Sequence, residues 1–118
     1  VRSEPVERVS ISTERTFARD IDDLGRLSAA GAEMAGRVAE ALRGRGRSAR
    51  TVTVKLRYAD FRTITRAETT ATPIDDADAI ARAARRLLRL ALAERPGALR
   101  LLGVGVSGLV AQRQLALF

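Results

Sequence analysis

The chain has 118 residues, which suits one domain with a modest core, and it contains neither Cys nor His, which excludes most zinc sites and nucleophilic triads. Its 21 Lys and Arg residues exceed its 14 acidic residues, and the net charge of +7 favours a polyanionic partner, nucleic acid or anionic membrane, unless a GC-rich genome has simply inflated its Arg content. No apolar run approaches the roughly 20 residues of a membrane span and no signal peptide opens the chain, so we expect a cytoplasmic protein.

The first segments indicate a linker, a strand and a helix. Residues 1–7 are polar and contain Pro5, which predicts a linker from an upstream region. Residues 8–16 are predicted to form a strand, because Val9, Ile11 and Thr13 alternate with Ser10, Ser12 and Glu14. Residues 22–43 are predicted to form an amphipathic helix, beginning at Asp22-Asp23, with an apolar stripe at Leu24, Leu27, Met34, Val38 and Leu42.

A hairpin is predicted next. The stretch TVTVKLRY, residues 51–58, places Val52, Val54, Leu56 and Tyr58 on one face and Thr51, Thr53, Lys55 and Arg57 on the other. A turn at Ala59-Asp60 leads to residues 61–70, whose many threonines favour a second strand.

A second helix and a last strand complete the pattern. Asp75 is the predicted N-cap, with Asp78 in the reciprocal capping position. The helix is expected to run to about Glu94 and to end before Pro96-Gly97, burying Ile80, Ala84, Leu87, Leu88 and Ala91. The last strand is predicted over residues 99–107, with a break at Gly108 and a tail over residues 108–118.

The element order is therefore β-α-β-β-α-β, an α+β fold with a domain over residues 8–107. Each helix has one apolar stripe and the sheet has one apolar face, so the helices are expected to pack together on that face of a four-stranded sheet. The other face, which carries Thr, Ser, Lys and Arg, stays open for binding. The pattern leaves the order of the strands open.

The sequence offers little for catalysis. Its carboxylate clusters, Asp22-Asp23 and Asp75-Asp76-Asp78, lie at predicted helix starts, where capping accounts for them. The glycines of residues 44–48 follow no strand and precede no Walker lysine. We expect no cofactor or metal in this chain and no activity from it alone.

Binding is better supported. Lys55 and Arg57 project from the open face, and Gly103 and Gly105 are two residues apart, so both point to one face of the last strand. Arg100 stands near the start of that strand. Glycines expose backbone N–H groups and guanidinium groups bind phosphate, so this arrangement suits contact with phosphates; a β-bulge at Gly105 and a solvated Arg100 are the alternative.

Three stretches, SISTERTF, VKLRYADFRTITRAET and RLLGVGVSGL, together resemble the C-terminal little finger domain of Y-family translesion DNA polymerases, most nearly the bacterial DNA polymerase IV group. The resemblance covers residues 5–118. It implies a domain that lays its sheet on the phosphates of the primer–template duplex and is tethered to a catalytic core outside this chain, whose palm holds the metal-binding carboxylates and Mg²⁺.

The resemblance also implies specific residues. Arg8, Ser10, Ser12 and Thr13 match a family strand that touches the template backbone, and Arg100, Gly103 and Gly105 match a last strand that meets DNA. Some relatives carry a basic residue where Gly105 stands, so the contact there could come only from the main chain. Arg66, in the Thr-rich strand, is a further candidate.

Two other functions remain to be weighed. An RNA-binding or ribosome-associated module usually places stacking aromatics on its sheet, and here Phe17, Tyr58, Phe61 and Phe118 form no paired platform in a strand. An oligomerising domain would need an apolar open face, so we expect a monomer.

The C-terminal stretch QLALF resembles the pentapeptide by which bacterial polymerases attach to the sliding clamp. That likeness implies a polar subsite for Gln114 and an apolar groove for Leu115, Leu117 and Phe118. The chain is therefore expected to have two partners, DNA on the sheet and the clamp on the tail.

Overall fold

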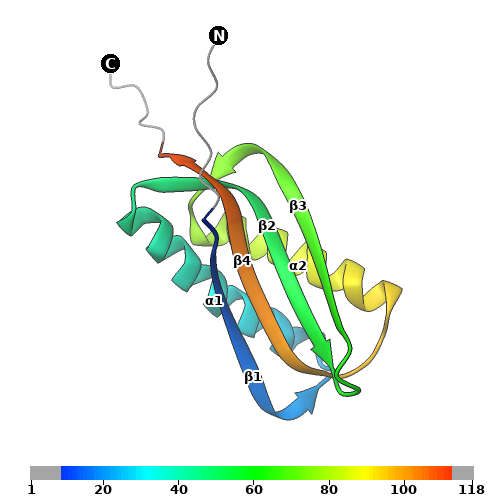
Figure 1. Ribbon diagram of the computed structural model, residues 1–118. Helices are drawn as coiled ribbons and strands as arrows, with labels where there is room; N and C mark the ends of the chain where they lie inside the picture. The colour runs from blue at the N-terminus through cyan, green and yellow to red at the C-terminus, as the bar shows by residue number, and fades with distance from the viewer. Residues whose placement is uncertain (1–8, 113–118) are drawn as a thin grey trace.

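The computed structural model describes residues 9–112, which form the predicted β-α-β-β-α-β order. The elements are β1 (Ile11–Ile21), α1 (Leu24–Gly44), β2 (Arg47–Tyr58), β3 (Thr63–Ile74), α2 (Ala77–Glu94) and β4 (Leu99–Ala111). All strand pairs are antiparallel, and the order across the sheet is β1-β4-β2-β3 (Figure 1). The last strand of the sequence therefore lies inside the sheet, between the first two.

Alternation along the strands separates the two faces of the sheet. Val52, Val54, Leu56 and Tyr58 of β2 are buried, as predicted, and they pack with Leu102, Val104 and Val106 of β4. Strand β1 is the amphipathic edge, where Ile11, Phe17 and Ile21 pack against this core and the residues between them are mostly exposed. Because side chains alternate with a period of two, every other position of each strand points away from the core.

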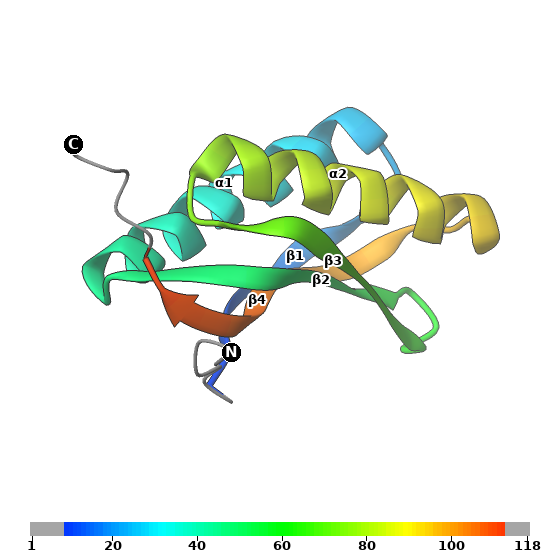
Figure 2. The same ribbon diagram turned by 90° about the horizontal axis from the view of Figure 1, so that it is seen from above.

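Both helices cover the same face of the sheet (Figure 2), as predicted. Asp23 is the N-cap of helix α1, and its carboxylate accepts hydrogen bonds from the N–H groups of Gly25 and Arg26. Helix α2 buries every residue of the predicted stripe, whereas on α1 the predicted stripe residue Leu24 is 37% exposed. The core is aliphatic: its largest fully buried side chains are Leu27, Leu42, Leu56, Ile80, Leu88, Leu99, Leu102 and Leu109.

The prediction that the last strand ends near Ser107 is wrong. Strand β4 continues to Ala111, since Gly108 adopts a left-handed backbone conformation (φ 66°) and the residues after it pair with Arg47–Ala49 of β2. Gln112 N–H then donates to the carbonyl of Gly46. The folded domain thus includes residues that we assigned to the tail, and β2 starts four residues before the predicted strand.

The other strand limits also move. Strand β1 spans residues 11–21 instead of 8–16, and β3 spans residues 63–74 instead of 61–70. The register between β2 and β3 shifts after Ala49, which lets the edge strand β3 reach Ile74. Pro73 fits there because an edge strand tolerates a missing N–H donor.

The N-cap of α2 is Asp76, not Asp75 as predicted. The Asp76 carboxylate accepts from the N–H of Ala79. Asp75 instead joins three segments, because its Oδ2 accepts from Ser48 Oγ at 3.0 Å and from Gln112 Nε2 at 2.7 Å. Because Asp75 and Asp76 are adjacent, the sequence alone does not tell which of them is the N-cap. The tertiary contacts of Asp75 leave Asp76 as the cap.

Candidate nucleic-acid interface

The open face of the sheet is built from rows of mostly polar residues that cross the strands. One row is Ser12, Gly105, Thr53 and Ala67, and the next is Glu14, Gly103, Lys55 and Thr65. A third row, toward the end of the sheet, contains Thr16, Leu101, Arg57 and Thr63. Hydroxyl groups and cations thus flank the central strand, which has no side chain at Gly103 and Gly105.

A groove of about 300 Å³ runs over this face. Its floor is β4, and its sides are β1 and β2 with a contribution from β3. None of the residues that line it is aromatic; they are Ser10, Ser12, Thr13, Glu14, Thr53, Lys55, Thr65, Gly103, Val104, Gly105, Val106 and Ser107. The surface is suited to hydrogen bonding and not to base stacking.

The two glycines have different surroundings. A Cβ at Gly103 would lie 3.3 Å from Glu14 Cβ and 3.5 Å from Lys55 Cβ, which confirms that this residue faces the groove between those two side chains. A Cβ at Gly105 would lie only 2.9 Å from Ser12 Cβ and 3.3 Å from the carbonyl oxygen of Ile11. Gly105 therefore also allows β1 to approach β4 closely, a packing role that the sequence alone did not indicate.

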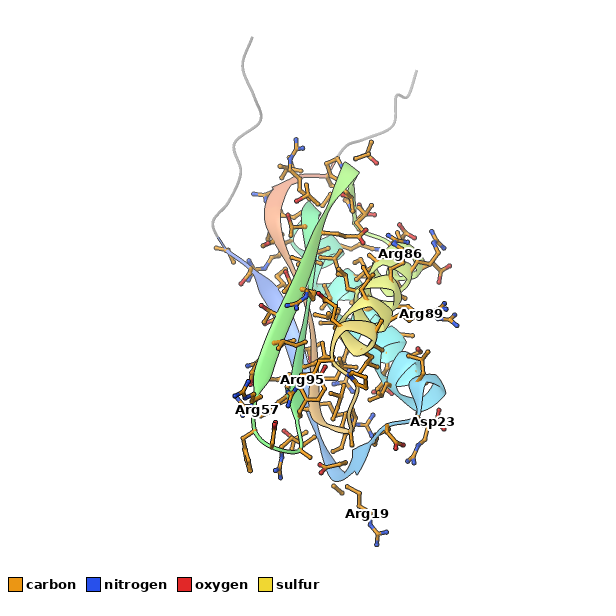
Figure 3. All side chains as sticks on the ribbon, turned by 90° about the vertical axis from the view of Figure 1, so that its right-hand side faces the viewer. Arg19, Asp23, Arg57, Arg86, Arg89 and Arg95 are labelled. Atoms are coloured by element: carbon orange, nitrogen blue, oxygen red, sulfur yellow. The ribbon has the colours of Figure 1, made fainter. Side chains whose placement is uncertain are left out.

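Charges on this face are few and partly paired. Lys55 Nζ lies 3.3 Å from Glu14 Oε2 across Gly103, and both side chains are well exposed. Arg57 Nε donates to Thr63 Oγ1 at 3.0 Å (Figure 3 labels Arg57 at the end of the sheet). An exposed ion pair of this kind contributes little to stability, so the lysine remains available to an anionic ligand.

Two predicted residues do not belong to the open face. Thr13 pairs in register with Val104, a core residue, so its side chain is on the helix side although the residue lines the groove. Arg66 pairs with Val54, also a core residue, and its Nε lies 2.8 Å from Glu94 Oε1 at the end of α2. That hydrogen bond raises the pKa of Arg66. Sequence reasoning identified the strand but not which of its faces Arg66 occupies.

The remaining candidates fall into three groups. Ser10, Ser12, Lys55, Gly103 and Gly105 line the groove. Arg57 lies one row beyond it, and Arg100 lies at the bulge where Leu99 and Leu101 of β4 oppose Tyr58 and Arg57 of β2. Arg8, Gln114, Leu115, Leu117 and Phe118 lie outside the described residues.

Glu14 is the charged groove residue that sequence reasoning missed. It faces the groove and holds Lys55, so it opposes any anion that approaches there. Its position could have been inferred from the alternation with Ser10 and Ser12, which places all three side chains on one face. The threonines Thr53 and Thr65 and Ser107 were likewise not singled out.

The helix side also carries arginines, but these face away from the groove. Arg86 Nη2 lies 2.6 Å from Glu68 Oε2, a hydrogen bond that raises the pKa of Arg86. Figure 3 shows Arg86 and Arg89 projecting from α2, on the side opposite the exposed sheet. Within residues 9–112 no group of three or more acidic side chains could hold a metal ion, and no helix is long and apolar enough to cross a membrane.

Solved structures share this fold. An insertion ternary complex of Dbh DNA polymerase aligns with a TM-score of 0.83 at 14% identity, covering 95% of this chain and 32% of that one. A complex of the beta-clamp processivity factor with the little finger domain of PolIV aligns with a TM-score of 0.69 at 22% identity, covering 93% of this chain and 97% of that one.

Sequence comparison identifies the family. A DNA polymerase IV of Streptomyces coelicolor is 43% identical over 112 residues, and one of Alkalilimnicola ehrlichii is 43% identical over 118 residues, each covering 95% of this chain. The chain spans 23% and 32% of those two proteins. The sequence profile of the impB/mucB/samB family C-terminal domain matches residues 8–117. The chain therefore belongs to that family and is a little finger domain of the Y-family, DNA polymerase IV-like proteins.

Proposed function

We propose that the open sheet face binds the primer–template duplex through its phosphates, within a longer polymerase that performs translesion synthesis. The observation that carries this proposal is the groove itself, in which Gly103 and Gly105 leave the central strand bare between hydroxyl groups and Lys55. Hydroxyl and cationic groups donate to phosphates and read no base sequence. The N–H groups of β4 are not available for this, because that strand pairs with β1 on one side and with β2 on the other. Contacts to phosphates tolerate damaged bases, as a translesion enzyme requires.

Catalysis is assigned to the part of the polymerase outside this chain. The described residues include no carboxylate cluster for a metal, so Mg²⁺ and the nucleotidyl transfer step would belong to a separate palm. In this proposal the little finger domain binds and orients the primer–template duplex. The 118-residue chain alone is expected to bind DNA without extending a primer.

The DNA site is tested by charge removal on opposite faces of the sheet. Lys55→Ala should lower affinity for a blunt duplex severalfold and reduce the salt slope by about one unit, because one phosphate contact is lost. Arg66→Ala is the matched control, since it removes the same charge from the helix side. Equal losses in both variants would contradict binding on the open face. The measurement is fluorescence anisotropy over a series of salt concentrations.

Glu14 provides a second test, in which removal of a charge should raise the affinity for duplex DNA. Glu14→Gln removes the carboxylate that holds Lys55 at 3.3 Å and that faces an approaching phosphate. Duplex affinity should therefore rise, by a few-fold at low salt, and the gain should fade as salt screens the charges. Unchanged or weaker binding at low salt would argue against a phosphate beside Lys55. A single-stranded RNA of equal length serves as competitor, and preference for it would favour the RNA-binding alternative.

We also propose that residues 114–118 bind the sliding clamp. The stretch QLALF offers three large apolar anchors, each worth about 1.5–3 kcal/mol before ordering costs, which is consistent with roughly micromolar affinity. The solved complex of a little finger domain with the beta clamp supports a clamp partner for this fold.

The tail is tested by deleting residues 114–118. Clamp binding should be lost, while affinity for free duplex should stay nearly unchanged, because the sheet lies elsewhere in the chain. Leu117→Ala should weaken clamp binding in the same direction. Equal loss of clamp and duplex binding on deletion would refute separate sites. Calorimetry with the purified clamp and anisotropy with the duplex measure the two affinities.

A further inference from the structure

Phe61, at the turn between β2 and β3, is an exposed aromatic residue that does not contribute to the core. The side chain is 66% exposed and belongs to no part of the buried cluster. Its backbone is left-handed, with φ 71°, in a region that favours Gly or Asn over a bulky residue. Two backbone hydrogen bonds fix this geometry, Phe61 N–H to the Tyr58 carbonyl and Tyr58 N–H to the Arg62 carbonyl. The turn therefore holds an aromatic ring out into solvent.

A cation covers one side of that ring. The guanidinium carbon of Arg100, in the bulge of β4, lies 4.2 Å from the centroid of the Phe61 ring. This contact orders the ring, and the large exposed fraction means that much of its surface remains free. An aromatic face beside an arginine is the arrangement on which proteins stack unpaired nucleobases.

The surroundings of the ring are cationic. Arg57, Arg62 and Arg100 form no ion pair with any described residue, as judged over residues 9–112. The nearby acid, Asp60, is already occupied: it accepts from Arg62 N–H at 3.0 Å and from Arg95 Nη2 at 2.6 Å. Those hydrogen bonds lower the pKa of Asp60, which stays ionised and committed to Arg95. The end of the sheet at the Phe61 turn thus attracts phosphates.

We propose that Phe61 and Arg100 form a stacking site for an unpaired base of single-stranded DNA that continues from the duplex on the open face. The row of Arg57, Leu101 and Thr16 connects the groove to this end of the sheet. The groove holds no aromatic residue, so the Phe61 turn would supply the stacking contact that the groove lacks. The proposal rests on the proposed duplex site for its orientation and makes single-strand binding a separate, measurable property.

The experiment compares two DNAs with the 118-residue chain. One is a blunt duplex, and the other carries a 5′ single-stranded overhang with 2-aminopurine, whose fluorescence changes when its stacking partners change. Wild-type protein should bind the overhang DNA about tenfold more tightly than the blunt duplex and change the fluorescence of the probe. Phe61→Asn should abolish both the preference and the fluorescence change but keep affinity for the blunt duplex. Asn tolerates the left-handed backbone, so the turn is retained, and circular dichroism checks the fold.

Two controls make the result specific. Leu90→Ala removes another exposed apolar side chain, 58% exposed on α2, and should change neither affinity. Phe61→Tyr keeps an aromatic face and should retain the preference. The proposal is overturned if wild-type protein shows no preference for the overhang, or if Phe61→Asn weakens both DNAs equally. If wild-type protein failed to bind the blunt duplex but still changed the fluorescence of the overhang probe, the proposed duplex site would be wrong and the stacking site would remain.

Discussion

At the scale of single residues, two glycines of β4, Gly103 and Gly105, both line the groove but differ in how closely β1 approaches them. Both point to the open face, and their lack of side chains leaves room in the groove above β4. Gly105 is the more constrained, because β1 approaches it so closely that a Cβ would fall 2.9 Å from Ser12 Cβ. Any residue with a side chain at this position would require β1 to shift.

The two glycines make a matched pair for a stability test. Gly105→Ala should destabilise the domain by about 1–2 kcal/mol, since a methyl group must push β1 outward against Ser12 and the Ile11 carbonyl. Gly103→Ala meets its nearest neighbour at 3.3 Å and should cost clearly less. Urea denaturation of both variants measures the difference in free energy of unfolding. A larger loss for Gly103→Ala would contradict the close approach.

At the scale of elements, the periodicity of the sequence predicted the buried faces of helices and strands better than it predicted where these elements end. The stripes of α2 and the alternation of β2 were correct because each follows from burial of one face. The ends of β4 and β3 were wrong because long-range pairing overrode local signals: Gly108 looks like a break, yet β2 supplies partners beyond it. Likewise the exposed faces of β1 and β2 were predicted, whereas the assignment of Arg66 to the helix side depends on register with Val54, which sequence does not give.

The junction of β2 with the loop after α2 depends on Tyr58 and Arg95. Tyr58 is 3% exposed, its hydroxyl donates to the Arg95 carbonyl at 2.7 Å, and the Arg95 guanidinium carbon lies 4.1 Å from the centroid of its ring. The loop also packs its backbone here, because a Cβ at Gly97 would lie 3.1 Å from the Tyr58 ring. This contact ties the turn that carries Phe61 to the start of β4.

Ionisation of Tyr58 is expected to destabilise the folded domain at alkaline pH. Burial raises the pKa of Tyr58 above its ordinary value of 10.0, although the nearby Arg95 charge opposes the shift. Because the pKa of Tyr58 is higher in the folded state than in the unfolded state, folding favours the protonated hydroxyl group. The resulting contribution to the free energy of unfolding is complete below pH 10 and is lost as the pH rises through the folded-state pKa. Stability should therefore fall above about pH 10, and Tyr58→Phe should remove that component while losing the hydrogen bond at neutral pH.

Tyr58 is the sole tyrosine of the chain, so absorbance of tyrosinate near 295 nm reports it alone. The native titration should have its midpoint above that of the urea-unfolded protein. Coincident midpoints would mean that the ring is not buried as described. Thermal melts of wild type and Tyr58→Phe across the same pH range then show whether the ionisation is coupled to unfolding.

At the scale of the whole molecule, the helix layer and the sheet layer have different roles. The helices cover one face of the sheet and supply the core, which leaves the other face free without exposing a large apolar surface (Figure 2). Strand β4, the floor of the groove, ends at Ala111, only three residues before Gln114. Three residues span roughly 10 Å at most, so the proposed clamp site begins within that distance of the end of β4.

That short separation predicts avidity on DNA encircled by the clamp. Binding at one site holds the other at an effective concentration of about millimolar, so two micromolar contacts should combine into an apparent affinity 10²–10³ times tighter than either alone. Deletion of residues 114–118 should return the apparent affinity to that of the sheet alone, whereas Lys55→Ala should lower it only severalfold. Insertion of a Gly-Ser spacer after Gln112 should reduce the gain gradually as the linker lengthens. Dissociation from end-blocked, clamp-loaded DNA measures the effect, and an apparent affinity equal to the tighter single site would mean that the sheet and the tail cannot engage together.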